Sequence, residues 1–469
     1  MPKNVLSEIK TIHLIGICGT AMGSVAVMLQ EQGYKITGSD ANIYPPMSTF
    51  LESNKVQLME GYREENLSHR PDLVIVGNAI SRGNPELEAV LNQHLFYLSL
   101  PETLRLFLLS KTKNLVVTGT HGKTTTTSLL AWIFEHCGKN PSYLIGGVPK
   151  NLPQGCKNQN GPFWILEGDE YDTCFFDKRS KFLHYLPELV ILNNLEFDHA
   201  DIFNSLEDIK ATFSRLIHIV PQNGIVVANA DDKNVKDVLR NAKSEVISVG
   251  FSSESNHQIT GSQVTSNGTI FQFMGESFFL PMYGSHNVHN ACMAITAANV
   301  YDIKLTMIAQ ALTQFKGIKR RMEVRGEARD IIIIDDFAHH PTAIQETLSA
   351  LKAKYPNRRL CALFEPRSNT TRRANFQDQL PEALALADYI GIGEVSRLDQ
   401  LPRENRLDPK KVVSDLLEAG KTSYYEPDVS IMIDRLTREL RAADVLVVLS
   451  NGSFGGLIQT LLNRLEAGP

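Results

Sequence analysis

The residues best suited to chemistry are seven consecutive ones, Gly119-Thr120-His121-Gly122-Lys123-Thr124-Thr125. A β-branched run, 116–118, precedes them and an apolar pattern of helical period follows them, which predicts a strand, a loop and a helix. Glycines let the backbone approach an anion closely, and the N–H groups of a first helical turn point toward it. Lys123 supplies a cation, and the hydroxyl of Thr124 suits a Mg²⁺ ion that bridges phosphates. The stretch is therefore a candidate phosphate-binding loop.

This loop departs from the general pattern Gly-x-x-x-x-Gly-Lys-[Ser/Thr], because Val117 stands where that pattern has its first glycine. The chain reads Gly-x-x-Gly-Lys-Thr instead. A helix N-terminus capped by threonines is the alternative interpretation. The strand pattern before the loop and the long apolar helix after it favour nucleotide binding.

Two acidic clusters follow the next predicted strands. Strand 163–166 leads into Glu167-Gly168-Asp169-Glu170-Tyr171-Asp172, and strand 189–192 leads into a stretch that ends with Glu196-Phe197-Asp198-His199. In an open parallel sheet, ligands bind beyond the carboxyl ends of the strands. Acidic surface loops are common, but two such clusters and a histidine beside a phosphate loop indicate a site for Mg²⁺ and ATP.

The N-terminal segment has the pattern of a βαβ unit, with strand 12–17, helix 21–32 and a second strand that ends near Asp40. Its loop, Gly16-Ile17-Cys18-Gly19-Thr20, imitates the dinucleotide fingerprint. Cys18, however, stands where that fingerprint requires a glycine. This argues against an ordinary NAD site, and so against a dehydrogenase, and for a variant nucleotide site. A tight turn without a ligand is the alternative. A further strand, 72–77, is followed by Asn78.

Two later stretches carry polar groups whose role is open. Residues 175–182 place Lys178, Arg179 and Lys181 beside aromatic residues, and they either grip a carboxylate-bearing substrate or form a basic surface turn. Asn287 and Asn290 share one helical face and can present amides to an adenine edge, or they belong to a capped helix start.

Two further regions of the sequence add expectations. Residues 245–283 alternate between apolar and polar, with Gly and Asn turns, and predict a small antiparallel excursion. The cluster Lys319-Arg320-Arg321 supplies cations suited to a γ-phosphate.

The last third begins with the apolar strand 331–334, followed by Asp335-Asp336-Phe337-Ala338-His339-His340-Pro341-Thr342. Strand 360–364 leads into Glu365–Thr370, and strand 445–449 leads into Ser450–Gly456. These loops should meet at one edge that faces the ATP site. Adjacent histidines suggest a metal, but side chains at i and i+1 diverge, which disfavours His339 and His340 as joint ligands.

Length and composition set the class of protein. A chain of 469 residues with 43% hydrophobic and 21% charged residues predicts about three globular domains. A formal net charge of −5 gives no case for nucleic acid or an anionic membrane. No stretch has the roughly 18 apolar residues of a membrane span, so we expect a soluble cytoplasmic protein. Six scattered cysteines without a C-x-x-C pair predict neither disulfides nor structural zinc.

Taken together, the motifs resemble the Mur ligases, ATP-dependent amide-forming enzymes of peptidoglycan metabolism. Seven blocks fall in the family's order, and these are 16–20, 119–125, 167–172, 198–199, 286–290, 319–321 and 335–342. The resemblance implies an α/β protein of three domains. These are a Rossmann-like UDP-sugar domain over 1–112, a central P-loop-type ATPase domain over 113–322, and a Rossmann-like peptide- and ATP-binding domain over 323–469.

Within the family, the stretches 38–49, 175–182, 365–370 and 450–456 are similar to members that join UDP-N-acetylmuramate to the recycled tripeptide L-alanyl-γ-D-glutamyl-meso-diaminopimelate. Members that add L-alanine to UDP-N-acetylmuramate are the alternative, and a non-catalytic nucleotide-gated binding protein is a third class. The resemblance implies an acyl-phosphate intermediate, with ATP and Mg²⁺, and a monomer or weak homodimer.

The resemblance also implies roles for individual residues. Catalysis would rest on Lys123, Glu167, His199 and Arg321. ATP would meet Gly119, Thr120, His121, Gly122, Lys123, Thr124, Thr125, Asn287, Asn290, Arg321 and Asp336, the last at the ribose. Mg²⁺ would be held by Thr124, Glu167 and His199, with Glu170 as a rival to Glu167. The UDP end would meet Gly16, Cys18, Gly19, Thr20, Asp40 and Asn78. The peptide would meet Arg367, Asn369, Lys178 and Arg179. Some members carry a carbamoylated lysine; Lys210 is the nearest candidate, at an unconvincing spacing.

Overall fold

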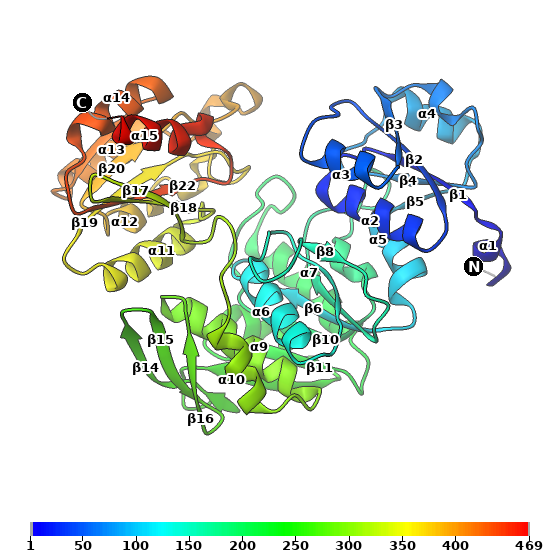
Figure 1. Cartoon of the computed structure of the whole chain (residues 1–469), viewed down its shortest axis with the longest axis horizontal. Coiled ribbons are helices and arrows are strands. Elements are labelled where there is room, and N and C mark those ends of the chain that lie inside the picture. The colour runs from blue at the N-terminus through cyan, green and yellow to red at the C-terminus, as the bar shows by residue number, and fades with distance from the viewer. Residues whose placement is uncertain (1–2, 468–469) are drawn as a thin grey trace.

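Three of the four β-sheets in the computed structural model, which describes residues 3–467, each form the centre of one lobe. Figure 1 shows the N-terminal lobe and the C-terminal lobe standing apart on top of the central lobe. Helices cover both faces of the parallel sheets, so strands such as Leu73–Val76 and Ile331–Asp336 are buried along their whole length. Among the described residues, no helix combines the length and the hydropathy needed to cross a membrane.

The N-terminal lobe is a five-stranded parallel sheet of order β3-β2-β1-β4-β5. Its strands are β1 (Thr11–Ile15), β2 (Lys35–Asp40), β3 (Gln57–Glu60), β4 (Leu73–Val76) and β5 (Tyr97–Ser99). Its helices are α1 (Lys3–Glu8), α2 (Thr20–Glu31), α3 (Met47–Ser53), α4 (Pro85–Asn92) and α5 (Leu100–Leu104), which continues into a π-turn at Arg105–Leu109.

The central lobe is an eight-stranded sheet of order β13-β12-β11-β10-β6-β9-β7-β8, antiparallel only at β7–β8. Its strands are β6 (Lys113–Thr118), β7 (Ser142–Leu144), β8 (Cys156–Lys157), β9 (Phe163–Glu167), β10 (Pro187–Leu192), β11 (Ile225–Asn229), β12 (Glu245–Gly250) and β13 (His257–Gln258). Its helices are α6 (Lys123–His136), α7 (Leu206–His218), α8 (Lys233–Leu239), α9 (Ser285–Val300) and α10 (Leu305–Thr313).

A separate antiparallel sheet lies beside this lobe and comprises β14 (Thr260–Thr265), β15 (Gly268–Phe273) and β16 (Glu276–Leu280). The expectation of one antiparallel excursion over 245–283 is therefore wrong for its first part. Strand β12 pairs in parallel with β11 and extends the main sheet instead. Alternation of apolar and polar residues identifies a strand but says nothing about the direction of its partner.

The C-terminal lobe is a six-stranded sheet of order β17-β18-β22-β19-β20-β21, in which only the edge strand β17 is antiparallel. Its strands are β17 (Glu323–Ala328), β18 (Ile331–Asp336), β19 (Arg359–Phe364), β20 (Tyr389–Ile392), β21 (Thr422–Tyr425) and β22 (Asp444–Leu449). Its helices are α11 (Pro341–Lys354), α12 (Gln379–Leu384), α13 (Pro409–Glu418), α14 (Val429–Glu439) and α15 (Leu457–Glu466). The first strand of the lobe is therefore β17, which precedes the apolar strand that was expected to be first, and β17 begins at residue 323, where this domain was expected to start.

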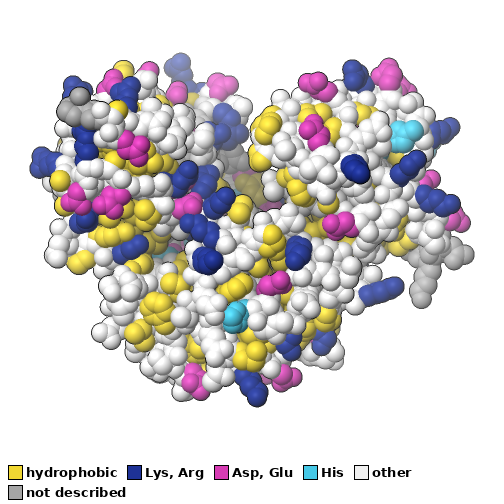
Figure 2. Space-filling view, viewed as in Figure 1, with side chains coloured by type: hydrophobic (Ala, Val, Ile, Leu, Met, Phe, Trp, Pro, Cys, Tyr) yellow, Lys and Arg dark blue, Asp and Glu magenta, His cyan; other side chains and the backbone are white. Residues whose placement is uncertain are grey.

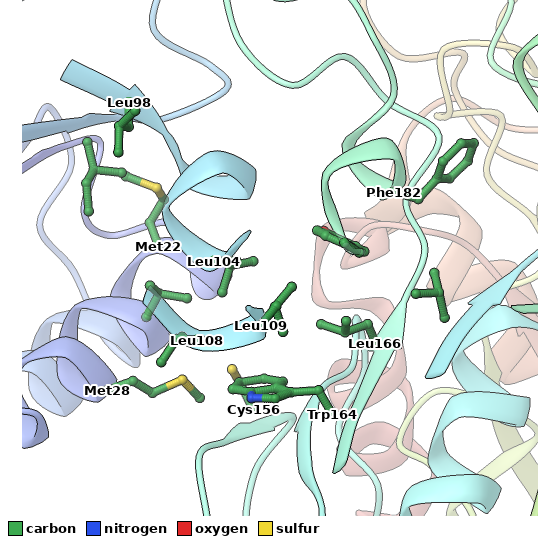
Figure 3. Close-up of a cluster of buried hydrophobic side chains, with 14 of the residues drawn as sticks. Met22, Met28, Leu98, Leu104, Leu108, Leu109, Cys156, Trp164, Leu166 and Phe182 are labelled. Carbon is green, nitrogen blue, oxygen red and sulfur yellow. The ribbon is translucent and has the colours of Figure 1, made fainter. Parts of the chain in front are cut away.

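An apolar cluster joins the N-terminal lobe to the central lobe. Figure 3 shows Leu104, Leu108 and Leu109 from the end of the N-terminal lobe facing Trp164 and Leu166 of β9. All five side chains are at most 7% exposed. Because all five belong to one buried cluster, the two lobes share a continuous core. Burial of such side chains stabilises this contact by about 25 cal/mol per Å² of apolar surface.

A strap of residues 169–181 gives a second contact between these lobes. Phe175 packs against a second apolar cluster, which includes Val74 and Val76 of β4. The ring of Phe176 lies 5.3 Å from the ring of Tyr97. Backbone hydrogen bonds join the two ends of the strap, because the N–H of Thr173 donates to the carbonyl of Arg179 at 3.0 Å and the N–H of Lys181 donates to the carbonyl of Tyr171 at 3.1 Å. At its tip, the guanidinium of Arg179 donates to Asp177 at 2.8 Å.

A buried polar network sits inside the N-terminal lobe. The side chain of Glu86 in α4 is fully buried, and its carboxylate lies 2.6 Å from Nε2 of His13. The same carboxylate accepts from the hydroxyl of Ser39 and the amide of Asn66, both at 2.9 Å. The network therefore links β1, β2 and the segment between β3 and β4 to α4.

We expect Glu86→Ala to lower the free energy of unfolding by about 3–5 kcal/mol, because it leaves buried polar partners without an acceptor. Glu88 lies on the same helix and pairs with the exposed Arg82, so Glu88→Ala is the matched control and should have little effect. Urea unfolding followed by circular dichroism measures both. Equal losses in the two variants would contradict the role given to the network.

A second prediction concerns the strap. Burial alone would raise the pKa of Asp177, but the bonds from Arg179 and the charge of His184 lower it to about 2, from 3.8. A carboxyl with a lowered pKa stabilises the folded state above its unfolded pKa and loses that effect as pH falls toward the folded value. Asp177→Asn should therefore be less stable than wild type at pH 7, and the difference should shrink between about pH 4 and about pH 2. Asp378→Asn, at a position with a 90% exposed side chain, should show no such trend.

Candidate active site

One cleft of about 1730 Å³ lies between the lobes and is lined by residues from all three. Figure 2 shows the surface hollowed between the two upper lobes, with Lys and Arg side chains gathered along the margin that belongs to the C-terminal lobe. The carboxyl ends of the parallel strands of the three sheets open toward this hollow, as expected for open α/β sheets. The cleft is therefore the place to look for a ligand site.

The candidate phosphate-binding loop connects β6 to α6 at the floor of the cleft. Gly122 adopts φ +77°, and a Cβ there would collide with the side-chain oxygen of Asn290. Only glycine fits this position without strain. The ammonium of Lys123 donates to the carbonyl of Gly119 at 2.7 Å and to Oε1 of Glu170 at 2.8 Å.

Glu170 connects the phosphate-binding loop to the loop that follows β10. Its Oε1 also lies 2.7 Å from Nε2 of His199, so one carboxylate oxygen serves two cationic groups. Burial would raise the pKa of Glu170, but Lys123 and His199 lower it to about 2. Burial lowers the pKa of His199, and the charge of Glu170 outweighs this and raises it. The arrangement is a buried triad of alternating charge.

Glu167 lies at the end of β9, next to the first turn of α6. Its two oxygens accept from the hydroxyl of Thr124 at 2.8 Å and from the N–H of Gly146 at 2.7 Å. Burial raises the pKa of Glu167. Close by, Oε2 of Glu170 is buried and has no hydrogen-bond partner among the described residues. Hydroxyl and carboxylate oxygens are ligands that Mg²⁺ prefers, so this donor set fits that ion.

The residues expected at the nucleotide line the same cleft. Asn287 and Asn290, on the first turns of α9, both reach it, as do Arg321 and Asp336 from the C-terminal side. The guanidinium of Arg321 lies 5.1 Å from the ring of Phe337. The two carboxylate oxygens of Asp336 accept from backbone N–H groups, which hold it at the cleft wall.

The N-terminal lobe contributes the opposite wall. Of the residues expected at the UDP end, those that line the cleft are Gly16, Gly19, Thr20, Asp40 and Asn78. Cys18 is not part of the lining; its backbone N–H donates to Asp40 at 2.9 Å and so positions that carboxylate. Burial and the charge of Asp40 raise the pKa of the Cys18 thiol to about 11, so it stays protonated at neutral pH.

Four residues expected at the peptide do not line this cleft. Lys178 pairs with Asp172 at 2.9 Å and Arg179 pairs with Asp177, so both are engaged within the strap. Arg367 lies 3.7 Å from Glu365 and its side chain is 47% exposed. Asn369 donates to Asp201 at 2.6 Å, across the boundary between two lobes.

Two further candidates also lie away from the lining. Gly119 is not part of the lining, although its carbonyl holds Lys123. Lys210, the doubtful candidate for carbamoylation, is on α7 and pairs with Asp237 at 3.1 Å. That pairing raises the pKa of Lys210, which disfavours the neutral amine that carbamoylation requires.

Other residues of the cleft were missed from the sequence. Asp231 lies two residues after the end of β11, and the rule that ligands bind beyond strand ends could have found it. Glu346 reaches the cleft from α11, one helical turn after Thr342. Its only sequence signal is that spacing, because the preceding motif ends at Thr342.

The C-terminal lobe contacts the central lobe through the loop that follows β10. Thr370 donates to Asp198 at 2.6 Å, and Thr342 donates to Glu196 at 2.7 Å. Both acceptors lie within three residues of His199 in the chain. The position of the C-terminal lobe is therefore linked to the loop that carries His199.

Comparisons with known proteins agree with this architecture. The model of the Mur ligase family catalytic domain matches residues 11–112, that of the Mur ligase middle domain matches 117–298, and that of the Mur ligase glutamate ligase domain matches 320–452. The UDP-N-acetylmuramate–L-alanyl-γ-D-glutamyl-meso-2,6-diaminoheptandioate ligase of Escherichia coli strain K12 is 41% identical over 462 residues, which cover 97% of this chain and 98% of that one.

Two further relatives extend the comparison. The UDP-N-acetylmuramate–L-alanine ligase of a Sulfurihydrogenibium strain is 32% identical over 98% of both chains. Among solved structures, a murein peptide ligase from Psychrobacter arcticus 273-4 is 37% identical, with a TM-score of 0.72 over 97% of this chain and 99% of that one. Family models and relatives thus cover nearly the whole chain, which belongs to the Mur ligase family.

Proposed function

We propose that this protein is an ATP-dependent amide ligase that joins UDP-N-acetylmuramate to the tripeptide L-alanyl-γ-D-glutamyl-meso-diaminopimelate. One observation carries the ligase chemistry: Lys123, His199 and Arg321 open onto the same cleft as the N-terminal loop. The choice of the tripeptide is supported by the identity of 41% to the E. coli relative, against 32% to an L-alanine ligase. Such an enzyme works in the cytoplasm, where its nucleotide substrates are made.

The chemistry requires activation of a carboxylate, which is a poor electrophile. The carboxylate of the sugar takes the γ-phosphoryl group of ATP, so that ADP leaves and an acyl phosphate forms. The peptide amine then attacks the acyl carbon, and the amide forms as inorganic phosphate leaves. Such reactions are catalysed mainly by positioning and by charge neutralisation.

The residues of the cleft can supply both effects. We assign Lys123 and Arg321 to the phosphoryl group in transfer, because these cations approach from the central and the C-terminal lobe. We assign Thr124, Glu167, Glu170 and His199 to Mg²⁺, which when bound neutralises charge on the phosphates. His199 would ligate as the neutral imidazole, so the ion would replace the proton between His199 and Glu170. Asn287 and Asn290 would meet the adenine and Asp336 the ribose, while the loop around Gly16 and Thr20 would meet the UDP group.

The peptide carboxylates need cations on the C-terminal side. Arg367 is the best placed of the four expected residues, because its guanidinium is half exposed and only loosely paired with Glu365. Asn369, on the same loop, would help to orient the peptide. Lys178 and Arg179 are weaker candidates because each already has a carboxylate partner. Contact between the C-terminal and central lobes over the acyl phosphate would exclude water.

We expect Lys123→Ala to lower the rate of phosphate release at least about 100-fold, because it removes a charge that acts on the transferring group. Affinity for UDP-N-acetylmuramate should stay within about twofold, because the proposed UDP site lies on the other wall of the cleft. Isothermal titration measures the affinity and a coupled phosphate assay measures the rate. Normal turnover by the variant would rule out the assigned phosphate-binding loop.

The substrate assignment is tested with the wild-type protein. Purified enzyme receives ATP, Mg²⁺ and UDP-N-acetylmuramate, together with either the tripeptide or L-alanine. We expect phosphate release and a new UDP-linked product with the tripeptide, at a kcat/KM at least about 100-fold above that for L-alanine, since several carboxylates add binding contacts. A preference for L-alanine would instead identify the chain as an alanine-adding ligase.

A further inference from the structure

A cluster of metal-ligating side chains lies at the junction of the phosphate-binding loop and the C-terminal lobe. It consists of His121 from that loop, Glu196 from the loop after β10, and His340 at the start of α11. One nitrogen or oxygen from each lies within 4.8 Å of the others. None of the three is among the residues assigned above to Mg²⁺.

The distances suit a small ion of low coordination number. Nε2 of His121 lies 3.1 Å from Oε2 of Glu196, and Nδ1 of His340 lies 3.4 Å from the same oxygen. In tetrahedral zinc sites with metal–ligand distances near 2.0–2.1 Å, neighbouring ligand atoms are about 3.3 Å apart. Two of the three edges of such a site are therefore already formed.

The hydrogen bonds around the cluster indicate the tautomer of His340. Nε2 of His340 lies 3.2 Å from the carbonyl of Phe197, which can only accept, so the proton is on Nε2 and Nδ1 carries a lone pair. Nδ1 accepts a hydrogen bond from the N–H of Thr342 at 3.2 Å, which caps α11, and it lies 3.4 Å from Oε2 of Glu196. A metal ion bound to Nδ1 would replace this cap bond, and it would also replace the proton that joins Nε2 of His121 to Glu196.

Surrounding groups orient these side chains as in known metal sites. The carbonyl of Phe197 fixes the tautomer of His340, and the hydroxyl of Thr342 donates to Oε2 of Glu196 at 2.7 Å. Such outer contacts commonly orient metal ligands. Glu346 lies on the same face of α11 as Thr342 and also lines the cleft, so it or a water molecule can complete the coordination.

We propose that His121, Glu196 and His340 form a binding site for a divalent transition-metal ion such as Zn²⁺. Two imidazole nitrogens and one carboxylate favour such an ion over Mg²⁺, which prefers oxygen. Because His340 belongs to the C-terminal lobe and the other two ligands to the central lobe, the ion clamps the two lobes together. Because His121 lies in the phosphate-binding loop, the clamp inhibits turnover; this consequence alone rests on the proposed function.

Binding is tested on nucleotide-free, full-length protein in excess Mg²⁺, with Co²⁺ as the probe because its visible absorption distinguishes four-coordinate from six-coordinate sites. We expect one four-coordinate Co²⁺ per chain. His340→Asn should weaken binding at least about 100-fold, since it removes a ligand while asparagine still caps α11. The matched control is His339→Asn, because His339 points to Phe337 and Asp198 and should not contribute.

A second variant distinguishes loss of the metal site from misfolding of His340→Asn. Thr342→Val keeps all three ligands and should weaken Co²⁺ binding about 10-fold, by loss of the bond that orients Glu196. Unchanged binding in both His340→Asn and Thr342→Val, or only six-coordinate Co²⁺ in wild type, would overturn the site.

Inhibition is measured separately, as the effect of Zn²⁺ on each protein relative to its own metal-free rate in excess Mg²⁺. Wild type and His339→Asn should be inhibited, and His340→Asn should be resistant. Zn²⁺ that binds through His340 without slowing turnover would refute the clamp but not the site. Failure of the ligase assay itself would refute the proposed function and leave the Co²⁺ result standing.

Discussion

The arrangement of the cleft depends on one carboxylate oxygen, Oε1 of Glu170, which lies 2.8 Å from the ammonium of Lys123 and 2.7 Å from Nε2 of His199. These three residues follow β9, β6 and β10, which are neighbours in the central sheet. The side chain of Glu170 is only 4% exposed, so its charge must be compensated from within the protein. The two cations do this and, in doing so, fix the ends of three strands before any ligand arrives.

The loop after β10, which carries His199, forms hydrogen bonds with the phosphate-binding loop and with the C-terminal lobe. Toward the central lobe, the N–H of Thr120 donates to the carbonyl of Asn194 at 3.0 Å, so the loop holds the phosphate-binding loop. Toward the C-terminal lobe, its carboxylates accept from Thr342 and Thr370. Hydrogen bonds to charged groups contribute about 1.5–3 kcal/mol each, an amount that substrate binding can offset. These bonds connect the two lobes through residues that lie outside the strands of both sheets.

Much of the fold could be predicted because buried parallel strands are short apolar runs followed by polar loops, as at Val116–Thr118 and Ile331–Ile334. The strand β17 was missed because Glu323–Ala328 has no apolar run; it forms only because β18 offers an edge. The pairing of Arg179 with Asp177 was also out of reach, since composition shows a cation but not its partner. The sequence also indicated that the side chains of His339 and His340 diverge. It could not show that His340 contacts His121, because that contact joins two different lobes.

The orientation of Arg321 could not be predicted from the sequence, because it depends on contacts with residues far away in the chain. Its neighbours Arg320 and Met322 adopt φ +59° and +47°, a region that non-glycine residues rarely occupy. Such backbone costs of order 1–3 kcal/mol per residue and persists only where the surroundings impose it. Here the guanidinium of Arg320 donates to the carbonyls of Ser450 and Gly452, at 2.6 and 2.5 Å, and holds the turn against the C-terminal sheet. Residue type alone suggested that Arg321 is a phosphate ligand, but contacts 130 residues away in the chain are what turn it toward the cleft.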